Sequence, residues 1–201
     1  HPDHGTIVCG PHEGAEIFEL TVGGFGLTGY IADVTLALAP LPGAAVVRDV
    51  GSTTSLQETV EVMRRTDPAA PVYSWNDLQR RGRGFGSGVV YQERFEAGPQ
   101  PPGDVRYRSL SSRRSPLPFP AFNRTTTAAL NRVYRRWEAR RPATTLPVLA
   151  AAFPINSKTT YFNLFGRSGF REYQLIVPDE AWDPVPHEMA RMIQRAEACV
   201  T

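Results

Sequence analysis

The sequence predicts an α+β fold in which an antiparallel sheet carries helices on one face. From residue 45 to residue 199, strand-like and helix-like segments alternate as β-α-β-β-α-β-β-α, which suits that architecture. The 201 residues are 41% hydrophobic and 21% charged, which is typical of a globular domain. Leu41-Pro42-Gly43 interrupts the pattern and predicts a boundary between a short unit of residues 1–41 and a larger domain of residues 42–201.

The short unit is predicted to place a glycine turn between a helix and a strand. Residues 13–20 are predicted to be helical. Four glycines then fall within positions 23–29, where the missing Cβ atoms let the backbone turn tightly or approach a ligand. Residues 30–39 alternate apolar and other side chains and end at Pro40, which predicts a strand.

The larger domain contains several short runs that are rich in apolar or β-branched residues. These runs predict strands at residues 45–50, 71–75, 89–95, 146–153 and 170–177. A polar, glycine-rich connection joins the second of them to the third, which indicates neighbouring strands.

Three helices are predicted between these strands and after them. Ser55 and Glu58 have the spacing of a capping box and open the first helix. Residues 126–140 form the second, and arginines occupy the side away from its apolar face. That apolar face consists of Leu130, Val133, Tyr134 and Trp137. Asp183 and Pro184 supply an N-cap and a first-turn proline for the last helix.

Three blocks of the chain, in order, carry a family resemblance. The first is Phe18-Glu19-Leu20-Thr21-Val22-Gly23-Gly24-Phe25-Gly26-Leu27-Thr28-Gly29-Tyr30-Ile31. The second runs from Tyr73-Ser74-Trp75-Asn76-Asp77-Leu78 to Arg81-Gly82-Arg83-Gly84-Phe85-Gly86-Ser87-Gly88-Val89-Val90-Tyr91. The third joins Phe153-Pro154-Ile155-Asn156 to Gly169-Phe170-Arg171-Glu172-Tyr173-Gln174-Leu175-Ile176-Val177-Pro178. Together the blocks resemble flavin oxidases of the vanillyl-alcohol oxidase type.

The resemblance implies a division of labour along the chain. Residues 1–41 would be the C-terminal part of an FAD-binding domain, and residues 42–201 an incomplete substrate (cap) domain. The family's main pyrophosphate loop and its C-terminal segment, which carries a catalytic lysine, have no counterpart here. We therefore expect an internal fragment, whose partners are the remaining segments of the same flavoenzyme.

The resemblance also implies FAD as the cofactor. Gly29, Tyr30 and Ile31 would line its adenosine end through backbone groups, and Gly23, Gly24 and Gly26 would shape the turn. The alternative is a purely structural turn between helix and strand. The expected reaction is oxidation of a secondary alcohol on a small sugar or sugar-like substrate, with hydride passing to the flavin and a base taking the hydroxyl proton. No catalytic residue is assigned.

Substrate contacts are expected from the third block. Gln174 stands among apolar residues, and the resemblance places it at the flavin and the substrate. Strand alternation puts Glu172 on the same face, where it could line the same pocket. Phe153 stands where a member of the family has an aromatic hydroxyl, and phenylalanine cannot donate a hydrogen bond. The alternative for Gln174 and Glu172 is a solvent-facing position.

The sequence leaves two other classes of function open. Gly24-x-Gly26-x-x-Gly29 fits the fingerprint of an NAD-dependent Rossmann protein, but that fingerprint needs a helix directly after it. The other alternative is a non-enzymatic α+β binding module without a flavin half. The upstream reading frame would separate these, because a second glycine-rich loop there supports the enzyme.

Charge and composition exclude several other partners. The formal net charge of +2 is too small to indicate a polyanion, so no nucleic-acid partner is expected despite the arginine-glycine run at residues 81–86. No apolar run approaches the roughly 20 residues that span a bilayer, and no signal-peptide pattern is present, so a cytoplasmic location is expected. The four histidines show no metal-ligand spacing, and Cys9 and Cys199 are expected to be free thiols.

Overall fold

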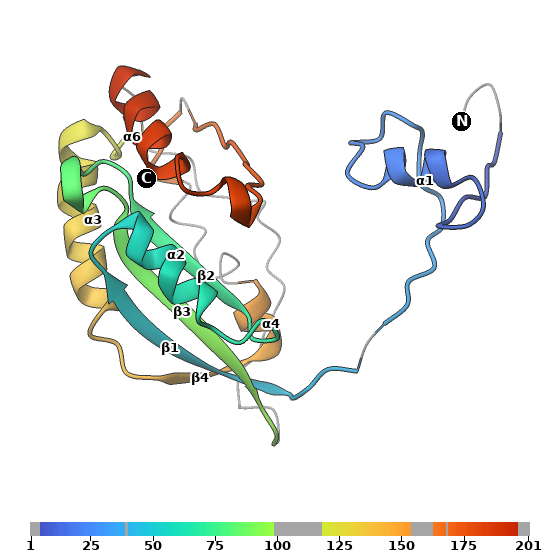
Figure 1. The fold of residues 1–201 in the computed structure, drawn as a ribbon, viewed down its shortest axis with the longest axis horizontal. Helices are drawn as coiled ribbons and strands as arrows, with labels where there is room; N and C mark the ends of the chain where they lie inside the picture. Colours follow the sequence, from blue (N-terminus) through green and yellow to red (C-terminus); the bar gives the residue numbers. More distant parts are fainter. Residues whose placement is uncertain (1–4, 39, 99–117, 154–162, 168, 197–201) are drawn as a thin grey trace. The chain divides into compact units, whose positions relative to one another are not determined.

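The structure is a computed structural model, and it describes residues 5–38, 40–98, 118–153, 163–167 and 169–196. The chain divides into two compact units, an N-terminal unit of residues 1–40 and a C-terminal unit of residues 41–201 (Figure 1). Among the helices in the described ranges, none has the length and the apolar character needed to cross a membrane.

The N-terminal unit confirms the predicted helix and glycine turn but not the strand after them. Helix α1 (Ala15–Thr21) corresponds to the helix predicted at residues 13–20, but it starts two residues later and ends one residue later. Turns follow at residues 22–28. The strand predicted at residues 30–39 is wrong, because residues 30–38 form neither strand nor helix and residue 39 lies outside the described ranges. The physical reason is that a strand needs a neighbour to pair its backbone groups, and residues 5–38 contain no strand.

The C-terminal unit is built on a four-stranded antiparallel sheet in the order β2-β3-β1-β4. Its strands are β1 (Ala45–Thr53), β2 (Val72–Asp77), β3 (Ser87–Glu96) and β4 (Thr144–Pro147). The register places Arg48 opposite Glu93 and Tyr73 opposite Tyr91. The predicted antiparallel sheet is confirmed, and the first three predicted strands of the larger domain are all present.

The helices of this unit also agree largely with the sequence pattern. They are α2 (Leu56–Arg64), α3 (Arg124–Glu138), α4 (Val148–Ala152) and α6 (Val185–Ala196), with the short 3-10 turns η1 (Gly82–Gly84) and η2 (Asp179–Ala181). Ser55 caps α2 as predicted, since its Oγ accepts a hydrogen bond from the Glu58 backbone N–H at 3.1 Å. Helix α6 begins two residues after Asp183, so that side chain is not its N-cap.

Helices lie on both faces of the sheet, so the prediction of helices on one face is wrong. Thr59 of α2 accepts a hydrogen bond from Asn76 of β2 at 2.8 Å, which places α2 over one face (Figure 1). Tyr134 of α3 is 2.9 Å from Tyr91 of β3, hydroxyl to hydroxyl. Tyr91 lies directly opposite Tyr73 of β2, so the two side chains share one face of the sheet. Asn76 is three residues after Tyr73 in the same strand, and successive strand residues point to opposite faces, so Asn76 lies on the other face. Helices α2 and α3 therefore contact opposite faces. Element order along the chain does not contain this information.

Helix α3 buries mainly polar side chains. Of the four residues of its predicted apolar face, Tyr134 packs against the sheet, with its ring centre 5.0 Å from that of Trp75, whereas the other three are exposed. Leu130 is 43% exposed, Val133 66% and Trp137 57%. A neighbouring face of the helix is buried instead. Its residues Thr127, Asn131 and Glu138, which recur at helical spacing, are at most 4% exposed. The reason is the sheet below, which presents hydrogen-bonding groups rather than a flat apolar surface to the helix.

Two strands predicted near the C-terminus are also wrong. Of the strand predicted at 146–153, only β4 forms, and Val148–Ala152 is helical because three alanines favour a helix once pairing with β1 stops at Pro147. Residues 169–178 form no regular element, although a strand was predicted at 170–177. No described strand lies beside that segment, so its backbone has no ladder to join.

Candidate functional site

The glycine turn of the N-terminal unit holds main chain in conformations that favour glycine. A Cβ on Gly24 would come within 2.1 Å of the Leu20 carbonyl oxygen, so a larger residue cannot pack against the end of α1 there. Gly26 has φ +77°, and its nearest neighbour would lie 3.9 Å from an added Cβ. Gly23 and Gly29 also have positive φ, at +74° and +140°. Gly24 therefore has no room for a side chain, whereas Gly23 and Gly26 leave bare backbone open.

The surroundings of this turn are open to solvent. Phe25 is 99% exposed, Leu27 89%, Tyr30 93% and Ile31 58%. The backbone N–H groups of Gly24, Leu27 and Gly29 already bond within the turn, at 3.0–3.2 Å. The turn therefore offers a ligand exposed main chain and apolar side chains rather than a ring of free N–H donors. Such a surface suits a flat, partly apolar group better than a phosphate.

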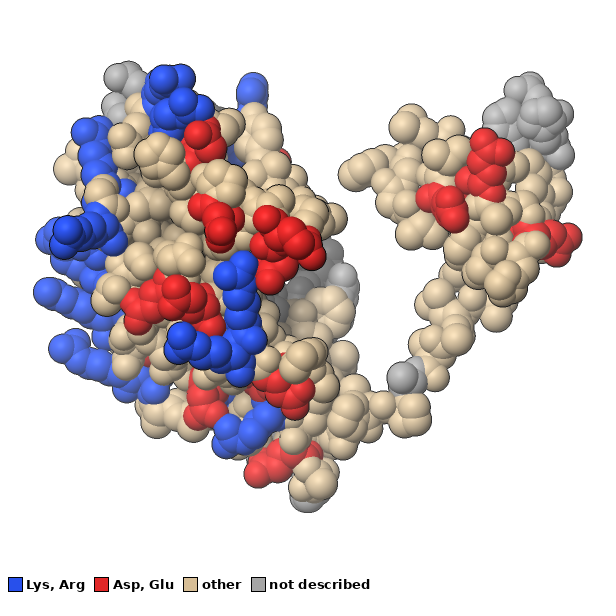
Figure 2. All heavy atoms as spheres, in the orientation of Figure 1, with Lys and Arg blue, Asp and Glu red and all other residues tan. Residues whose placement is uncertain are grey.

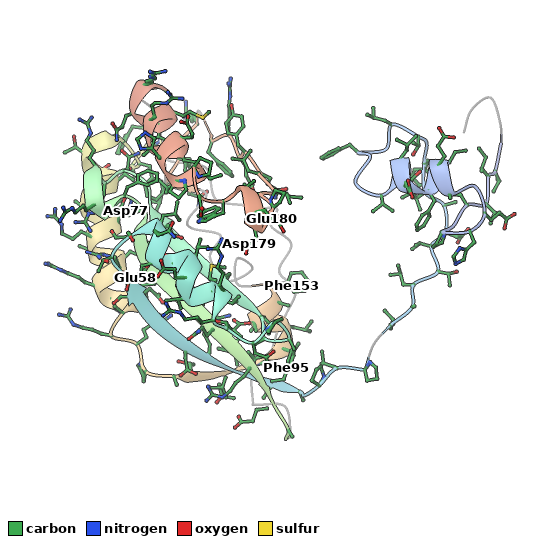
Figure 3. The ribbon with its side chains drawn as sticks, in the orientation of Figure 1. Glu58, Asp77, Phe95, Phe153, Asp179 and Glu180 are labelled. Carbon is green, nitrogen blue, oxygen red and sulfur yellow. The ribbon has the colours of Figure 1, made fainter. Side chains whose placement is uncertain are left out.

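The predicted substrate residues lie in the C-terminal unit, and the structure does not gather them into one site. Glu172 and Gln174 are exposed, in the irregular segment whose Tyr173 and Ile176 are 81% and 98% exposed. Phe153 is 51% exposed and follows α4 directly (Figure 3). Within the described residues, no hydrogen bond or ring contact joins these three side chains. Their roles stay predictions.

Sequence reasoning missed a polar cluster between the sheet and α3. Arg48 of β1 and Glu93 of β3 form an ion pair whose Nη2–Oε1 distance is 2.6 Å, with side chains 15% and 5% exposed. The Arg48 guanidinium also lies 5.5 Å from the ring centre of Tyr73 and 5.9 Å from that of Tyr91. Tyr73 and Tyr91 stack on each other at 4.7 Å. The pairing partners are about 45 residues apart, so only the strand register reveals the cluster.

The chemistry of this cluster is set by desolvation. Burial raises the pKa of Tyr91, and its hydrogen bonds to Tyr134 and Glu138 raise it further. Burial likewise raises the pKa values of Tyr73 and Tyr134. These phenols therefore stay protonated at physiological pH and act as hydrogen-bonding groups, not as bases. The cluster joins α3 to the sheet through the hydrogen bond between Tyr91 and Tyr134.

Two of the hollows on the described part of the C-terminal unit lie beside its helices. One, of about 620 Å³, opens between the start of α2, η1 and α6, and its lining includes Arg81, Phe85 and His187. The other, of about 350 Å³, lies between α3 and the turn after β2. None of Phe153, Glu172 and Gln174 lines either one. The arginine-glycine run is folded: Phe85 is 8% exposed, and its carbonyl accepts a hydrogen bond from the Leu56 N–H.

Fold and sequence together define an α+β chain with a distant relationship to an oxidase. One relative is decaprenylphosphoryl-beta-D-ribose oxidase of Mycolicibacterium smegmatis, which is 24% identical over 176 residues. The match covers 83% of this chain but 38% of that protein, so the chain spans well under half of its relative's length. No protein-family profile matches the chain.

Proposed function

We propose that this chain forms part of an FAD-dependent oxidoreductase that oxidises a secondary alcohol on a sugar or sugar-like substrate. The observation that carries the proposal is the exposed glycine turn, which stands in a chain whose residues align over most of their length with an oxidase. In this proposal the N-terminal unit is the end of the FAD-binding domain. The C-terminal unit is the substrate-binding part.

The residues of the turn fit the adenosine end of FAD. Gly23 and Gly26 leave open space where a side chain would stand, and Tyr30 and Ile31 present exposed side chains next to that backbone. Bound FAD would accept the hydride from the alcohol carbon. The protein's part here is to hold the adenosine end against bare main chain, with Gly24 fixing the turn to α1 and Gly29 ending it.

In the substrate part, each proposed residue has a chemistry suited to a sugar. The amide of Gln174 can donate to one hydroxyl and accept from another, and the carboxylate of Glu172 can accept from hydroxyl donors. Phe153 offers an apolar ring to the C–H face of a sugar. All three side chains are exposed, so a ligand or further protein can reach them without rearrangement of a core.

The NAD-dependent alternative loses its basis, because no helix follows Gly29 in residues 30–38. The non-enzymatic binding module remains the alternative to the flavoenzyme. Expression of the complete reading frame from its own start codon separates the two. We expect a yellow product with the visible absorbance bands of a flavin, and activity on sugar alcohols in the presence of an electron acceptor. A colourless product that binds no added FAD would leave the binding module.

Point variants of that product test the turn itself. Gly26→Val puts a branched side chain where φ is +77° and should lower the FAD content. Gly51→Ala is the matched control, because Gly51 lies in β1 with open space around it and no positive φ. Equal FAD content in both variants would argue against the turn as a cofactor contact. The 201-residue chain alone is expected to purify without flavin and without activity.

A further inference from the structure

The smaller hollow of the C-terminal unit is lined by a concentration of arginines. Its lining comprises Asp77, Gln79, Arg80, Ala128, Arg132, Arg135 and Arg136, around about 350 Å³. Figure 2 shows basic side chains in a column along the edge of the unit where α3 runs. Although the whole chain has a net charge of only +2, the charge at this edge is strongly positive.

One of these arginines is held in place by the protein. Arg80 Nη1 donates a hydrogen bond to Ser87 Oγ at 2.8 Å, and Ser87 is fully buried. The guanidinium also lies against Gly84, where an added Cβ would come 3.0 Å from the Arg80 Cζ. Part of the guanidinium edge is thus fixed toward the hollow before any ligand arrives.

Arg132, Arg135 and Arg136 of α3 have no acidic partners in the described part of the chain. Arg132 and Arg136 are four residues apart on the same helix face, where like charges destabilise a helix. No described carboxylate forms an ion pair with Arg132, Arg135 or Arg136. By contrast, Arg48 and Arg94 in the sheet are both paired with acids. A bound anion would remove this repulsion.

Asp77 is the one acidic side chain in the lining, and it is turned to the protein. Its Oδ1 accepts hydrogen bonds from Asn131 Nδ2 at 2.8 Å and from the Gln79 N–H at 3.1 Å. Asp77 is 4% exposed, at the end of β2 (Figure 3). With four guanidinium groups and one carboxylate, the formal charge around the hollow is positive.

We propose that this hollow binds a phosphoryl group on a soluble ligand. Guanidinium groups donate paired, charge-assisted hydrogen bonds to phosphate oxygens, and a doubly charged phosphoryl group compensates several arginines at once better than a carboxylate does. In this proposal Arg80 is the fixed contact, and Arg132, Arg135 and Arg136 close on the ligand from α3. The site does not depend on flavin binding.

Titration of the full chain with inorganic phosphate and inorganic pyrophosphate, at constant ionic strength, tests the proposal by calorimetry. We expect saturable binding of at least one of them, weakened about tenfold or more in R132Q/R136Q. R65Q is the control, because Arg65 is 79% exposed and lies outside the lining of the hollow; it removes one positive charge, whereas the double variant removes two. Its binding should equal that of the unmodified chain. Glutamine keeps the helix propensity close to that of arginine, so the fold is retained.

A second arm distinguishes a soluble phosphate from a lipid headgroup. Phosphatidylcholine vesicles that contain phosphatidic acid are sedimented with the same three proteins. Arginine-dependent binding of free phosphate or pyrophosphate supports the proposal. Sedimentation that depends on Arg132 and Arg136, without binding of the soluble anions, overturns it in favour of a lipid surface. No binding in either arm, or equal binding by R132Q/R136Q and R65Q, also overturns it.

Discussion

Replacement of Arg48 by methionine should strongly destabilise the C-terminal unit. The change leaves the Glu93 carboxylate, which is 5% exposed, without the guanidinium that lies 2.6 Å away. Loss of one member of a buried ion pair costs about 3–5 kcal/mol, and the value should lie near 3 because Arg48 keeps 15% exposure. Methionine retains the apolar bulk of the arginine stem, so the cost reports mainly the charge. Urea unfolding gives the free energy directly.

Two further variants complete the test. Arg48→Met combined with Glu93→Met removes both charges, and it should be more stable than Arg48→Met alone because no unpaired charge stays buried. Arg94→Met breaks the pair with Asp49 between the same two strands, where the side chains are 63% and 44% exposed, and should cost less than about 1 kcal/mol. If Arg48→Met costs no more than Arg94→Met, the reasoning from burial is refuted.

Three further predictions concern α3, a glycine and a helix cap. Asn131→Ala should lower the free energy of unfolding by about 1–3 kcal/mol, because the buried Asp77 carboxylate loses the hydrogen bond from the Asn131 amide. Leu130→Ala should cost under about 1 kcal/mol, because Leu130 is 43% exposed. Equal losses of stability in urea unfolding would contradict this prediction. Gly86→Ala should lower the free energy of unfolding by about 2 kcal/mol or more, because φ at Gly86 is +68° and the added Cβ would lie 2.4 Å from Leu56 Cβ. The control Gly51→Ala, where the added Cβ meets no neighbour, should change the free energy of unfolding by at most about 0.5 kcal/mol, as measured by thermal unfolding. Hydrogen bonds from the Thr54 hydroxyl and backbone N–H hold the pKa of Glu58 in the folded state below its usual 4.5. The ionised Glu58 carboxylate therefore stabilises the fold above pH 4.5, and this stabilisation is lost as the pH falls through the lower folded pKa. The stability difference between the unmodified chain and Glu58→Gln should therefore shrink on acidification below pH 4.5, and a constant difference would contradict the assignment.

Sequence reasoning identified most local elements because their signals lie within a few residues. The Ser55 cap, the glycine turn after α1 and the long helix α3 depend on neighbouring residues, and all three are present in the structure. The candidate site was predicted less completely. Its glycine turn could be recognised from composition alone, whereas the exposure of Gln174 could not, because an alternating pattern looks the same with or without a partner strand.

By itself, the sequence determined where the chain can turn, where helices start and which runs can extend. Tertiary structure decided which extended runs become strands: residues 45–53 found partners on both sides, whereas residues 30–38 and 170–177 found none. It also decided which face of α3 is buried and that Arg48 meets Glu93. The physical reason is that backbone pairing and charge burial are settled between segments far apart in the chain, where no local pattern specifies the register.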